Sequence, residues 1–544
     1  MSAPSSLFSA AVPVDLTRGN ADHHDLGRAL AAGAVRFGGV AISFAGAEGI
    51  LTTTLGALYA EAERVGTALA GLGLRQGDVL VCQVPHCAEA VSAFLACVMR
   101  GIVFVPVVHI FGPAELGFIL RQSKARALLV PARWRNIDFA ERIGAVRTAG
   151  FEGLVVTIGD AGIDAPTAKW NDLARTEPSA AQHPLDGGEP CCLLYTSGTT
   201  SVPKGVIHTR STILAESLGI SAFFDATGPL PMLVGSPAGH IGGIVAMVRP
   251  YILGIVSGFL DRWDTDLAIR LITEKALAWC NAVPFHIRAV IPAASAGKLP
   301  SFRFAIVGGA SVPPSLVRDA DQVGIRVCRS YGSTEHPTVT YSLPTDPIEL
   351  RAESDGRCVN GNEILIVDDD GRPLPGGTPG EVWTRGPERF AGYFDSALDQ
   401  EALGTDGWYR TGDIGVVSAA GYLTIVDRKK DIIIRGGENI SSREIEDIAT
   451  SHPAVAEAAA IGWPDAALGE RVGVFLRLHP GRTLTIEELQ AHFRDCGVAR
   501  QKSPERLVLL GDFPRNASGK VLKAELRRRA RLASASATDR TADG

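Results

Sequence analysis

A short loop between Leu193 and Gly205, with the sequence LLYTSGTTSVPKG, has the composition of a phosphate-binding site. A triphosphate carries many acceptor oxygens, so a loop that binds it needs several donors and a backbone that can approach closely. The common P-loop has Gly-Lys followed by Ser or Thr, whereas here the lysine precedes its glycine. The donors and the small residue of this loop are Thr196, Ser197, Gly198, Thr199, Thr200 and Lys204. Taken alone, the same composition also fits a Ser/Thr-rich surface loop.

The elements that must position this loop alternate between helix and strand. Apolar residues with helical spacing occur at 53–73, 87–100, 112–125 and 313–324, and strand-like apolar runs occur at 78–85, 102–108, 126–131, 303–310 and 326–334. Such alternation with short links predicts parallel sheets that are covered by helices on both faces. In open sheets of this kind, ligands bind beyond the carboxyl ends of the strands. Loops with chemically useful residues follow strands at Thr196, Gly308 and Gly332.

The C-terminal part of the chain has a different pattern. After about residue 350, turn signals such as DDDGRP and GGTPG separate short strands, which predicts a smaller β-rich subdomain. Beyond Arg428, helices and strands alternate over about one hundred residues, enough for a compact α+β domain. The small and polar residues at 533–544 predict a disordered tail. A chain of 544 residues exceeds what one hydrophobic core supports, so two or more domains are expected.

Charge and cysteine content exclude several classes of protein. The chain has 53 basic and 59 acidic residues, and its basic triplet at 527–529 fits the solvated face of a helix, so we expect no nucleic-acid partner. Nine cysteines without a CxxC pair predict a reduced, cytoplasmic protein. The apolar segment 90–111 is long enough to span a bilayer, but Arg100-Gly101 and Pro106 interrupt it. We therefore expect a buried helix that ends near Arg100, then a buried strand, and no membrane span.

Four further motifs follow the loop along the chain. They are YGSTE at 331–335, GWYRTGD at 407–413, DRKKDIIIRGG at 427–437 and PRNASGK at 514–520. Together with YTSGTTSVPKG, they resemble the signature motifs of the adenylate-forming superfamily, which includes acyl-CoA synthetases, aryl-acid ligases, luciferases and peptide-synthetase adenylation domains. The resemblance runs from about residue 50 to about residue 530. It implies an α/β protein with a large N-terminal domain of doubly wound sheets, a small β-rich subdomain and a mobile C-terminal α+β domain.

The resemblance implies a reaction in two steps. A carboxylate attacks the α-phosphate of ATP and expels pyrophosphate, and a thiol then attacks the resulting acyl-adenylate. Because the first step develops charge on phosphate, Mg²⁺ is expected, held by a carboxylate. By position in the motifs, Glu335 is the expected metal ligand, Thr196 is a second candidate ligand, and Thr334 is expected to bind the α-phosphate.

The remaining ATP contacts are also implied by position in the motifs. Asp413 is expected to bind the ribose, because a carboxylate can accept from both hydroxyls of a vicinal diol. Arg428 is expected to contact the same sugar. The expected contacts to adenine and to the phosphates are Gly308, Gly309, Ala310, Tyr331, Gly332 and Ser333, with Tyr331 beside the base.

The acyl pocket is expected around His240, because SPAGHIGGI at 236–244 resembles the family motif whose histidine borders the acyl group. The alternative is a histidine buried in the core. Gly239 stands where the family often has an aromatic residue, and Gly242 and Gly243 are small as well. With Gly332, they predict room for a medium-chain or alicyclic hydrophobic acid.

The thiol is expected to be that of coenzyme A. RGGENIS at 435–441 makes the chain most similar to acyl-CoA ligases of the medium-chain and cyclohexanecarboxylate type, which suggests fatty acid metabolism, and the chain lacks a carrier domain. The alternatives are an adenylating enzyme that loads an aryl or acyl acid onto a carrier protein, and a non-catalytic acyl-nucleotide binder. The joint presence of Lys204, Glu335, Asp413 and Lys520 argues against a non-catalytic binder. Assembly as a homodimer is compatible with the sequence.

The two steps need different groups at one place, and the resemblance implies that the C-terminal domain rotates between them. Residues 1–426 are expected to form the N-terminal domain, 427–430 the hinge with Lys430 as its pivot, and 431–532 the mobile domain. Lys520 is expected to bridge the carboxylate and the α-phosphate in the first step, since a lysine with an ordinary pKa near ~10.4 is charged. Gly436 and Gly437, on the opposite face, are expected to line the path of the CoA thiol in the second step.

Overall fold

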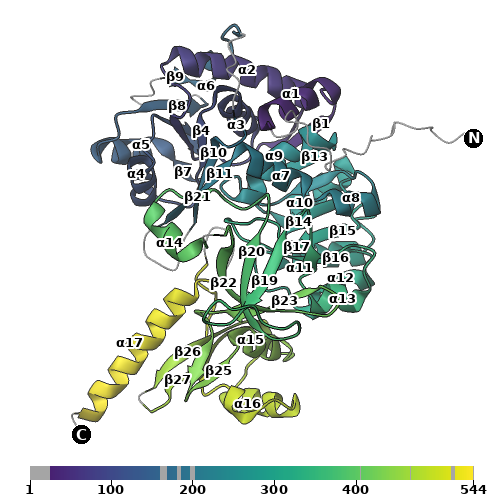
Figure 1. The fold of residues 1–544 in the computed structure, drawn as a ribbon, viewed down its shortest axis with the longest axis vertical. Helices are drawn as coiled ribbons and strands as arrows, with labels where there is room; N and C mark the ends of the chain where they lie inside the picture. The colour runs from purple at the N-terminus through teal and green to yellow at the C-terminus, as the bar shows by residue number, and fades with distance from the viewer. Residues whose placement is uncertain are drawn as a thin grey trace, which may run out of the picture.

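The computed structural model describes residues 25–159, 168–179, 186–196, 203–404, 406–465, 467–515 and 521–542. Two large sheets and a smaller antiparallel sheet occupy the upper part of the molecule in Figure 1. The C-terminal domain lies below them, with helix α17 (Lys523–Ala542) projecting at its side. The predicted α/β fold, with parallel sheets and a separate C-terminal unit, is confirmed.

The first large sheet has eight strands. In spatial order they are β21 (Gly392–Tyr393), β11 (Lys204–Thr209), β10 (Pro190–Thr196), β4 (Val103–Pro106), β3 (Val79–Cys82), β5 (Ala127–Pro131), β8 (Leu154–Ile158) and β9 (Ala168–Lys169). The strands from β10 to β9 are parallel, whereas β11 runs antiparallel to both of its neighbours. One face packs on α4 (Pro113–Gln122) and α5 (Phe139–Thr148), and the other on α2 (Leu55–Gly71) and α3 (Ala88–Arg100).

The second large sheet has nine strands. In spatial order they are β18 (Arg357–Cys358), β17 (Thr340–Tyr341), β16 (Arg326–Tyr331), β15 (Phe304–Val307), β14 (Trp279–Ala282), β12 (Met232–Val234), β13 (Ser257–Leu260), β1 (Ala41–Gly46) and β2 (Gly49–Thr54). Its outer face packs on α10 (Thr265–Lys275), α11 (Pro284–Ser295) and α12 (Pro314–Gln322). Its inner face shares one core with the first sheet, filled by α2, α3, α1 (Leu26–Arg36), α7 (Arg210–Leu218) and α9 (Ile241–Leu253). The result is a layered αβαβα domain.

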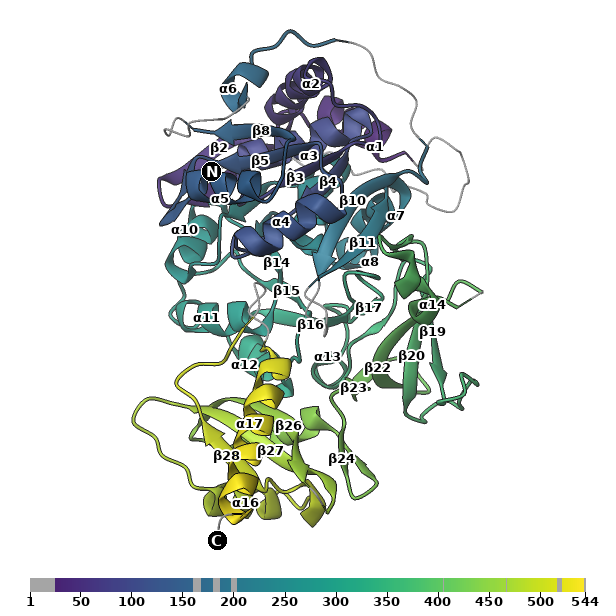
Figure 2. The same cartoon turned by 90° about the vertical axis from the view of Figure 1, so that its left-hand side faces the viewer.

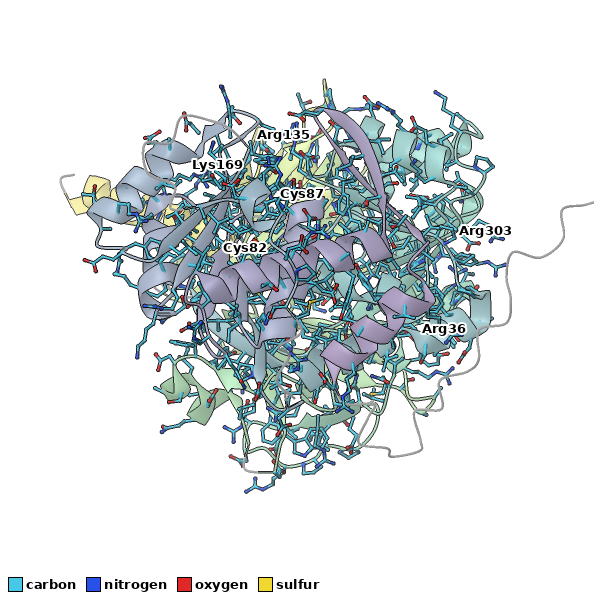
Figure 3. The ribbon with its side chains drawn as sticks, turned by 90° about the horizontal axis from the view of Figure 1, so that it is seen from above. Arg36, Cys82, Cys87, Arg135, Lys169 and Arg303 are labelled. Carbon is cyan, nitrogen blue, oxygen red and sulfur yellow. The ribbon has the colours of Figure 1, made fainter. Side chains whose placement is uncertain are left out.

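The helix and strand expected within 90–111 are confirmed. Helix α3 ends at Arg100, and Gly101 adopts the left-handed conformation at φ 66°, which stops the helix before β4 begins at Val103. Among the described residues, no helix combines the length and the apolar character that crossing a membrane would need. All nine cysteines are free thiols, and Figure 3 shows Cys82 among the central side chains, with Arg303 at the outer edge.

The smaller sheet is antiparallel and connects the two parts of the molecule. Its strands are β19 (Glu363–Val367), β20 (Gly380–Arg385), β22 (Tyr409–Val417) and β23 (Leu423–Arg428). Figure 2 shows β23 leading down into the C-terminal domain through β24 (Ile433–Arg435). The shorter elements of the N-terminal part are β6 (Arg133–Trp134), β7 (Ile137–Asp138), α6 (Trp170–Leu173), α8 (Ser221–Thr227), α13 (Ile348–Glu353) and α14 (Asp399–Ala402).

The C-terminal domain has a five-stranded sheet with helices. Its elements are β24, β25 (Glu438–Ile440), β26 (Val455–Asp465), β27 (Gly469–Leu478), β28 (Arg506–Leu509), α15 (Ser442–Thr450), α16 (Ile486–Asp495) and α17. Helix α17 continues to Ala542, whereas the sequence predicted a disordered tail at 533–544, so the structure differs from that prediction over 533–542. Alanine and arginine favour helix, so a helix that packing has started earlier in the chain can extend through such a sequence.

Candidate active site

A large cavity brings most of the sequence-predicted site residues together. Its volume is about 2590 Å³, and it lies where β10, β15 and β16 end, facing the antiparallel sheet and the C-terminal domain. This position agrees with the rule that ligands bind beyond the carboxyl ends of parallel strands. The predicted residues that line it are Thr196, Lys204, His240, Gly242, Gly308, Gly309, Ala310, Gly332, Ser333, Thr334, Glu335, Asp413, Arg428 and Lys430.

Other predicted residues are not part of this lining. Ser197, Gly198, Thr199, Thr200 and Lys520 lie outside the described residues. On either side of Lys520, however, Arg515 and Lys523 both line the cavity. Gly436 and Gly437 form the exposed turn between β24 and β25, with φ of 58° and 89°, and they do not line the cavity. The CoA path along Gly437 therefore stays a prediction that requires a different domain arrangement.

Asp413 is the centre of a hydrogen-bonded group at one end of the cavity. Its Oδ2 accepts from the Tyr331 hydroxyl at 2.7 Å, and its Oδ1 lies 3.1 Å from Nε of Arg428. Strands β22 and β23 create this pair, because Asp413 and Arg428 stand opposite each other in register. Burial, followed by the Asp413 charge, raises the pKa of Tyr331 well above its ordinary value, so its hydroxyl remains a donor. Tyr331 orients Asp413 through this hydrogen bond, and its expected place beside the base stays a prediction.

Glu335 contacts the strand β21. The Tyr393 hydroxyl donates to its Oε1 at 2.8 Å, and Lys204 Nζ lies 5.5 Å from the centre of the Tyr393 ring. Burial, followed by the Glu335 charge, raises the pKa of Tyr393, so this donor also stays protonated. Lys204 and Thr196 face each other at the ends of the β10–β11 hairpin. A carboxylate at this position suits Mg²⁺, which usually binds one or two carboxylates together with substrate phosphates.

A buried histidine holds the loop that carries Thr334 and Glu335 in place. His208 Nε2 donates to the carbonyl oxygen of Thr334 at 2.7 Å, and burial lowers the pKa of His208 to about 4. A Cβ at Gly332 would lie 1.8 Å from the carbonyl oxygen of Pro337, and one at Gly308 would lie 2.4 Å from Ser330 Oγ. Both glycines are therefore required by backbone packing, whatever they do for a ligand.

The glycines near His240 correct part of the sequence interpretation. Cβ atoms at Gly239 and Gly243 would lie 2.5 Å from Val108 Cγ1 and 2.2 Å from the Pro237 carbonyl oxygen. These two glycines therefore serve close packing, and the space expected from them is already filled by the protein. At Gly242 the nearest atom would be Ser236 Oγ at 3.4 Å, so this glycine does leave room.

His240 itself precedes the first turn of α9 and lines the cavity. Its Nε2 is buried and has no hydrogen-bond partner within the described part of the chain. Burial lowers its pKa to about 4, so the imidazole is neutral near pH 7. A neutral, unpaired imidazole at a cavity wall can contact a carboxylic acid without placing a charge next to the phosphates.

A buried polar cluster beside the acyl end was missed by the sequence analysis. It consists of Glu216, Arg249, Thr338, Asn360, Asn362 and Glu388. Glu216, Arg249 and Thr338 line the cavity. A signal for it was present: Arg249 interrupts the apolar run of α9, and a charge on a buried helix must find a partner.

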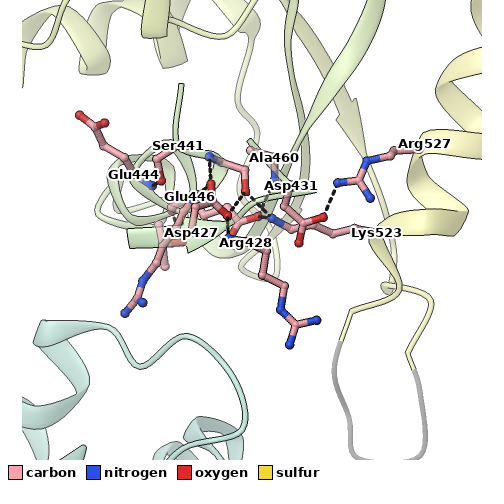
Figure 4. Close-up of polar contacts among 12 residues, drawn as sticks. Asp427, Arg428, Asp431, Ser441, Glu444, Glu446, Ala460, Lys523 and Arg527 are labelled. Carbon is pink, nitrogen blue, oxygen red and sulfur yellow. Dashed lines mark hydrogen bonds and ion pairs between the residues drawn. The ribbon is translucent and has the colours of Figure 1, made fainter. Parts of the chain in front are cut away.

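The hinge is tied to the C-terminal domain by a second group of polar contacts, shown in Figure 4. Asp427 accepts from the backbone N–H and the hydroxyl of Ser442, which fixes the start of α15. Lys523 Nζ lies 2.6 Å from Glu446 Oε1 and donates to Ser442 Oγ at 2.8 Å. Arg527 pairs with Asp431. The first turns of α17, which directly follow the segment with Lys520, are thus held against the hinge.

Lys430 combines a position in the hinge with a place on the cavity wall. Burial and then the charge of Arg428 lower its pKa. A lysine in such surroundings gains from a nearby anion, because the anion would offset both effects.

Comparison with known proteins agrees with the resemblance that the sequence motifs showed. The family model described as AMP-binding enzyme matches residues 35–394, and the model of the AMP-binding enzyme C-terminal domain matches residues 444–520. Medium-chain fatty-acid–CoA ligase of Escherichia coli K12 is 33% identical over 467 residues, which cover 84% of this chain and 82% of that protein. Sulfoacetate–CoA ligase of Cupriavidus necator is 32% identical over 479 residues, covering 87% and 92%.

Solved structures agree in fold. ATP-bound MatB from Rhodopseudomonas palustris matches with a TM-score of 0.81 and 26% identity over 90% of this chain and 95% of its own. The anthranilate CoA ligase AuaEII in complex with anthranoyl-AMP matches with a TM-score of 0.85 and 25% identity over 94% and 98%. The two family models match the chain in the same order as the N-terminal and C-terminal domains predicted from the sequence. The cavity lies where the predicted sequence motifs come together. The chain therefore belongs to the AMP-binding enzyme family.

Proposed function

We propose that the protein is an AMP-forming acid–CoA ligase. It activates a carboxylic acid with ATP to an acyl-adenylate, releases pyrophosphate, and transfers the acyl group to coenzyme A. The observation that carries this proposal is the convergence of Thr196, Lys204, Thr334, Glu335 and Asp413 on one cavity in a chain of this family. The named relatives on which the proposal rests are ligases that form CoA thioesters.

Each proposed role follows from the chemistry of the side chain. Asp413, held by Tyr331 and Arg428, binds the ribose hydroxyls through its two oxygens. Lys204 and the hydroxyls of the loop after Thr196 bind the β- and γ-phosphates, and Thr334 binds the α-phosphate. Glu335 would hold Mg²⁺, which would supply neutralisation of negative charge at the phosphates. His240 borders the incoming acid, and Lys520 bridges its carboxylate to the α-phosphate.

The acid itself is proposed to be mainly hydrophobic and of medium size. Ile220, Ile241 and Ile306 line the cavity, and Gly242 leaves room there because a Cβ would lie 3.4 Å from its nearest neighbour, Ser236 Oγ. The acceptor is proposed to be free coenzyme A, reached when the C-terminal domain rotates about Lys430. A cytoplasmic location and assembly as a homodimer remain predictions from the sequence.

One assay series tests the proposal. ATP–pyrophosphate exchange is measured across straight-chain, alicyclic and aryl carboxylic acids, and thioester formation is then measured with and without CoA. We expect Mg²⁺-dependent exchange with medium-length acids and CoA-dependent thioester. Exchange without CoA thioester, but with acylation of a carrier protein, would favour the carrier-loading alternative. Nucleotide binding with no exchange for any acid would favour a non-catalytic binder.

A further inference from the structure

The inner wall of the acyl end contains an arginine whose donors are mostly unused. Arg249 is only 2% exposed, and its Nη2 donates to Glu216 Oε1 at 3.1 Å. Its Nε and Nη1 have no hydrogen-bond partner anywhere in the described parts of the chain. Buried polar groups are nearly always paired, so these unpaired N–H groups require a partner that the protein does not supply. Arg249 is part of the cavity lining, so a ligand in the cavity lies next to this side chain.

The position of Arg249 along helix α9 sets its distance from the end of the helix at which His240 lies. Gly242 and Arg249 both line the cavity and are seven residues apart, which places them on one face of the helix about 10 Å apart along its axis. His240 lies at the outer end of this path. Three bonds of an extended chain span about 3.5 Å, so an extended acid of roughly eight carbons reaches from the His240 end to Arg249.

The charges of the buried polar cluster decide what kind of group fits. Burial raises the pKa of Glu216, and its contacts with Arg249 and with the Thr338 hydroxyl at 2.8 Å oppose that rise. Glu388 accepts from the neutral amides of Asn360 and Asn362, and its carboxyl also shares a side-chain hydrogen bond with Glu216. Burial, followed by the charge of Glu216, raises the pKa of Glu388 well above its usual range, so its carboxyl is protonated. Arg249 forms its ion pair with Glu216, and the carboxyl group of Glu388 also acts on it electrostatically.

We propose that Arg249 is a specificity-determining residue, whose free N–H groups bind a neutral hydrogen-bond acceptor at the far end of a medium-length carboxylic acid. A ketone or hydroxyl oxygen near the seventh carbon fits this description. A second carboxylate is disfavoured, because it would lie beside two carboxyl groups, Glu216 and Glu388, that already share Arg249. This inference rests on the proposed function and adds the substrate class.

The competing explanation is that Arg249 only joins α7 to α9 through Glu216. Arg210 provides a matched control for that role. It also lies on α7, is 3% exposed, and bonds Asp25 at 2.7 Å and the Val98 carbonyl oxygen at 2.7 Å, but it does not line the cavity. Its replacement removes a buried arginine pair without touching the acyl end.

The test compares acids that differ only at the far end. The ratio kcat/KM in ATP–pyrophosphate exchange is measured for octanoate, 7-oxooctanoate and octanedioate with the unmodified protein, Arg249→Met and Arg210→Met. We expect the unmodified protein to prefer 7-oxooctanoate over octanoate about 10- to 100-fold, since charge-assisted hydrogen bonds have that strength, and to use octanedioate less well. Arg249→Met should bring the preference to about one, mainly through KM, while octanoate is still used. Arg210→Met should keep the preference.

A second variant protects the test against misfolding. Arg249→Met leaves Glu216 without its counter-ion, so the double variant Glu216→Met/Arg249→Met removes both charges together. It should fold and show no preference for 7-oxooctanoate. Equal use of octanoate and 7-oxooctanoate by the unmodified protein, a preference for octanedioate, or a preference that survives Arg249→Met would each overturn the inference while leaving the ligase activity standing. Absence of exchange with every acid would overturn the proposed function as well.

Discussion

The two ends of the cavity treat their polar side chains in opposite ways. At the nucleotide end, Asp413 and Glu335 each accept from a tyrosine hydroxyl at 2.7 Å and 2.8 Å. At the acyl end, His240 Nε2 and two nitrogens of Arg249 have no partner within the described residues. The first end is already organised by the protein, whereas the second has donors that only a ligand can satisfy.

This difference indicates where the protein is general and where it is selective. A pre-oriented carboxylate loses little conformational freedom when ATP binds, so it suits a substrate that every turnover shares. Buried unpaired donors reject a ligand that lacks the matching acceptor, so they suit discrimination between acids. Changes at the nucleotide end should therefore affect all acids alike, and changes at the acyl end should affect acids unequally.

The largest effect is expected for Lys520, which we propose that the C-terminal domain supplies to the nucleotide end. Lys520→Ala should abolish adenylate formation for every acid, because it removes the cation that is proposed to bridge carboxylate and α-phosphate. It should still convert a supplied acyl-adenylate and CoA to thioester. Gly437→Leu should do the reverse, forming adenylate and then stalling. The two half-reactions are measured separately by pyrophosphate exchange and by thioester formation from synthetic adenylate.

Gly437→Ala is the matched control for backbone strain. Gly437 has φ 89°, so any side chain is strained there, yet a Cβ would meet no atom within 4 Å in this arrangement. If the alanine variant retains thioester formation and the leucine variant does not, obstruction of the thiol path is the cause. Loss of both half-reactions in Lys520→Ala and Gly437→Leu alike would contradict the two-face mechanism.

Glu335→Gln should lower the rate of adenylation on the order of 10²–10³, because it keeps the shape but removes a charge that acts in the transition state. The loss should be the same for octanoate and for 7-oxooctanoate, and raising Mg²⁺ should restore part of it. Exchange rates across a Mg²⁺ titration measure this. An unchanged rate with unchanged metal dependence would remove Glu335 from the metal site.

Asp413→Ala should weaken binding of ATP and of a non-hydrolysable acyl-adenylate analogue equally, since both carry the same ribose. Charge-assisted hydrogen bonds contribute roughly 1.5–3 kcal/mol, which isothermal titration calorimetry resolves. Tyr331→Phe, which removes only the hydroxyl that orients Asp413, is the milder comparison and should cost less. Binding of ATP by Asp413→Ala as tight as that of the unmodified protein would place the ribose elsewhere.

The smallest effect is expected for Glu388 and concerns stability. Burial raises the pKa of this carboxyl in the folded state, whereas in the unfolded state the glutamate has its ordinary pKa. The folded state therefore keeps the proton to a higher pH than the unfolded state does. The contribution of Glu388 to the free energy of unfolding is therefore complete at low pH and falls as the pH rises. Glu388→Gln should remove this fall, gaining about 1 kcal/mol relative to the unmodified protein between pH 5 and 6. Urea unfolding measures it, with exposed Glu349→Gln as the control that should show no such trend.

The sequence was most informative where function depends on local spacing. The motif around Tyr331 to Glu335 and the loop after Thr196 could be recognised because neighbouring residues serve one ligand. The alternation of helices and strands also predicted the end of α3 at Arg100 and the presence of β4 after it, since helical and strand periodicities are local properties. The spacing did not show that Gly239 and Gly243 fill space against Val108 and Pro237, because close packing joins distant segments.

The sequence by itself determined the family, the nucleotide-facing residue types and the layered α/β fold, because these follow from local periodicity and from motifs that are continuous in the chain. Only the tertiary structure decided that Tyr331 orients Asp413, and that Glu216, Arg249 and Glu388 meet beside the acyl end. Glu388 lies 172 residues beyond Glu216 in the chain (388 − 216). The free energy of such a cluster depends on burial and on pairing across several elements, and neither is encoded in the spacing of any one segment.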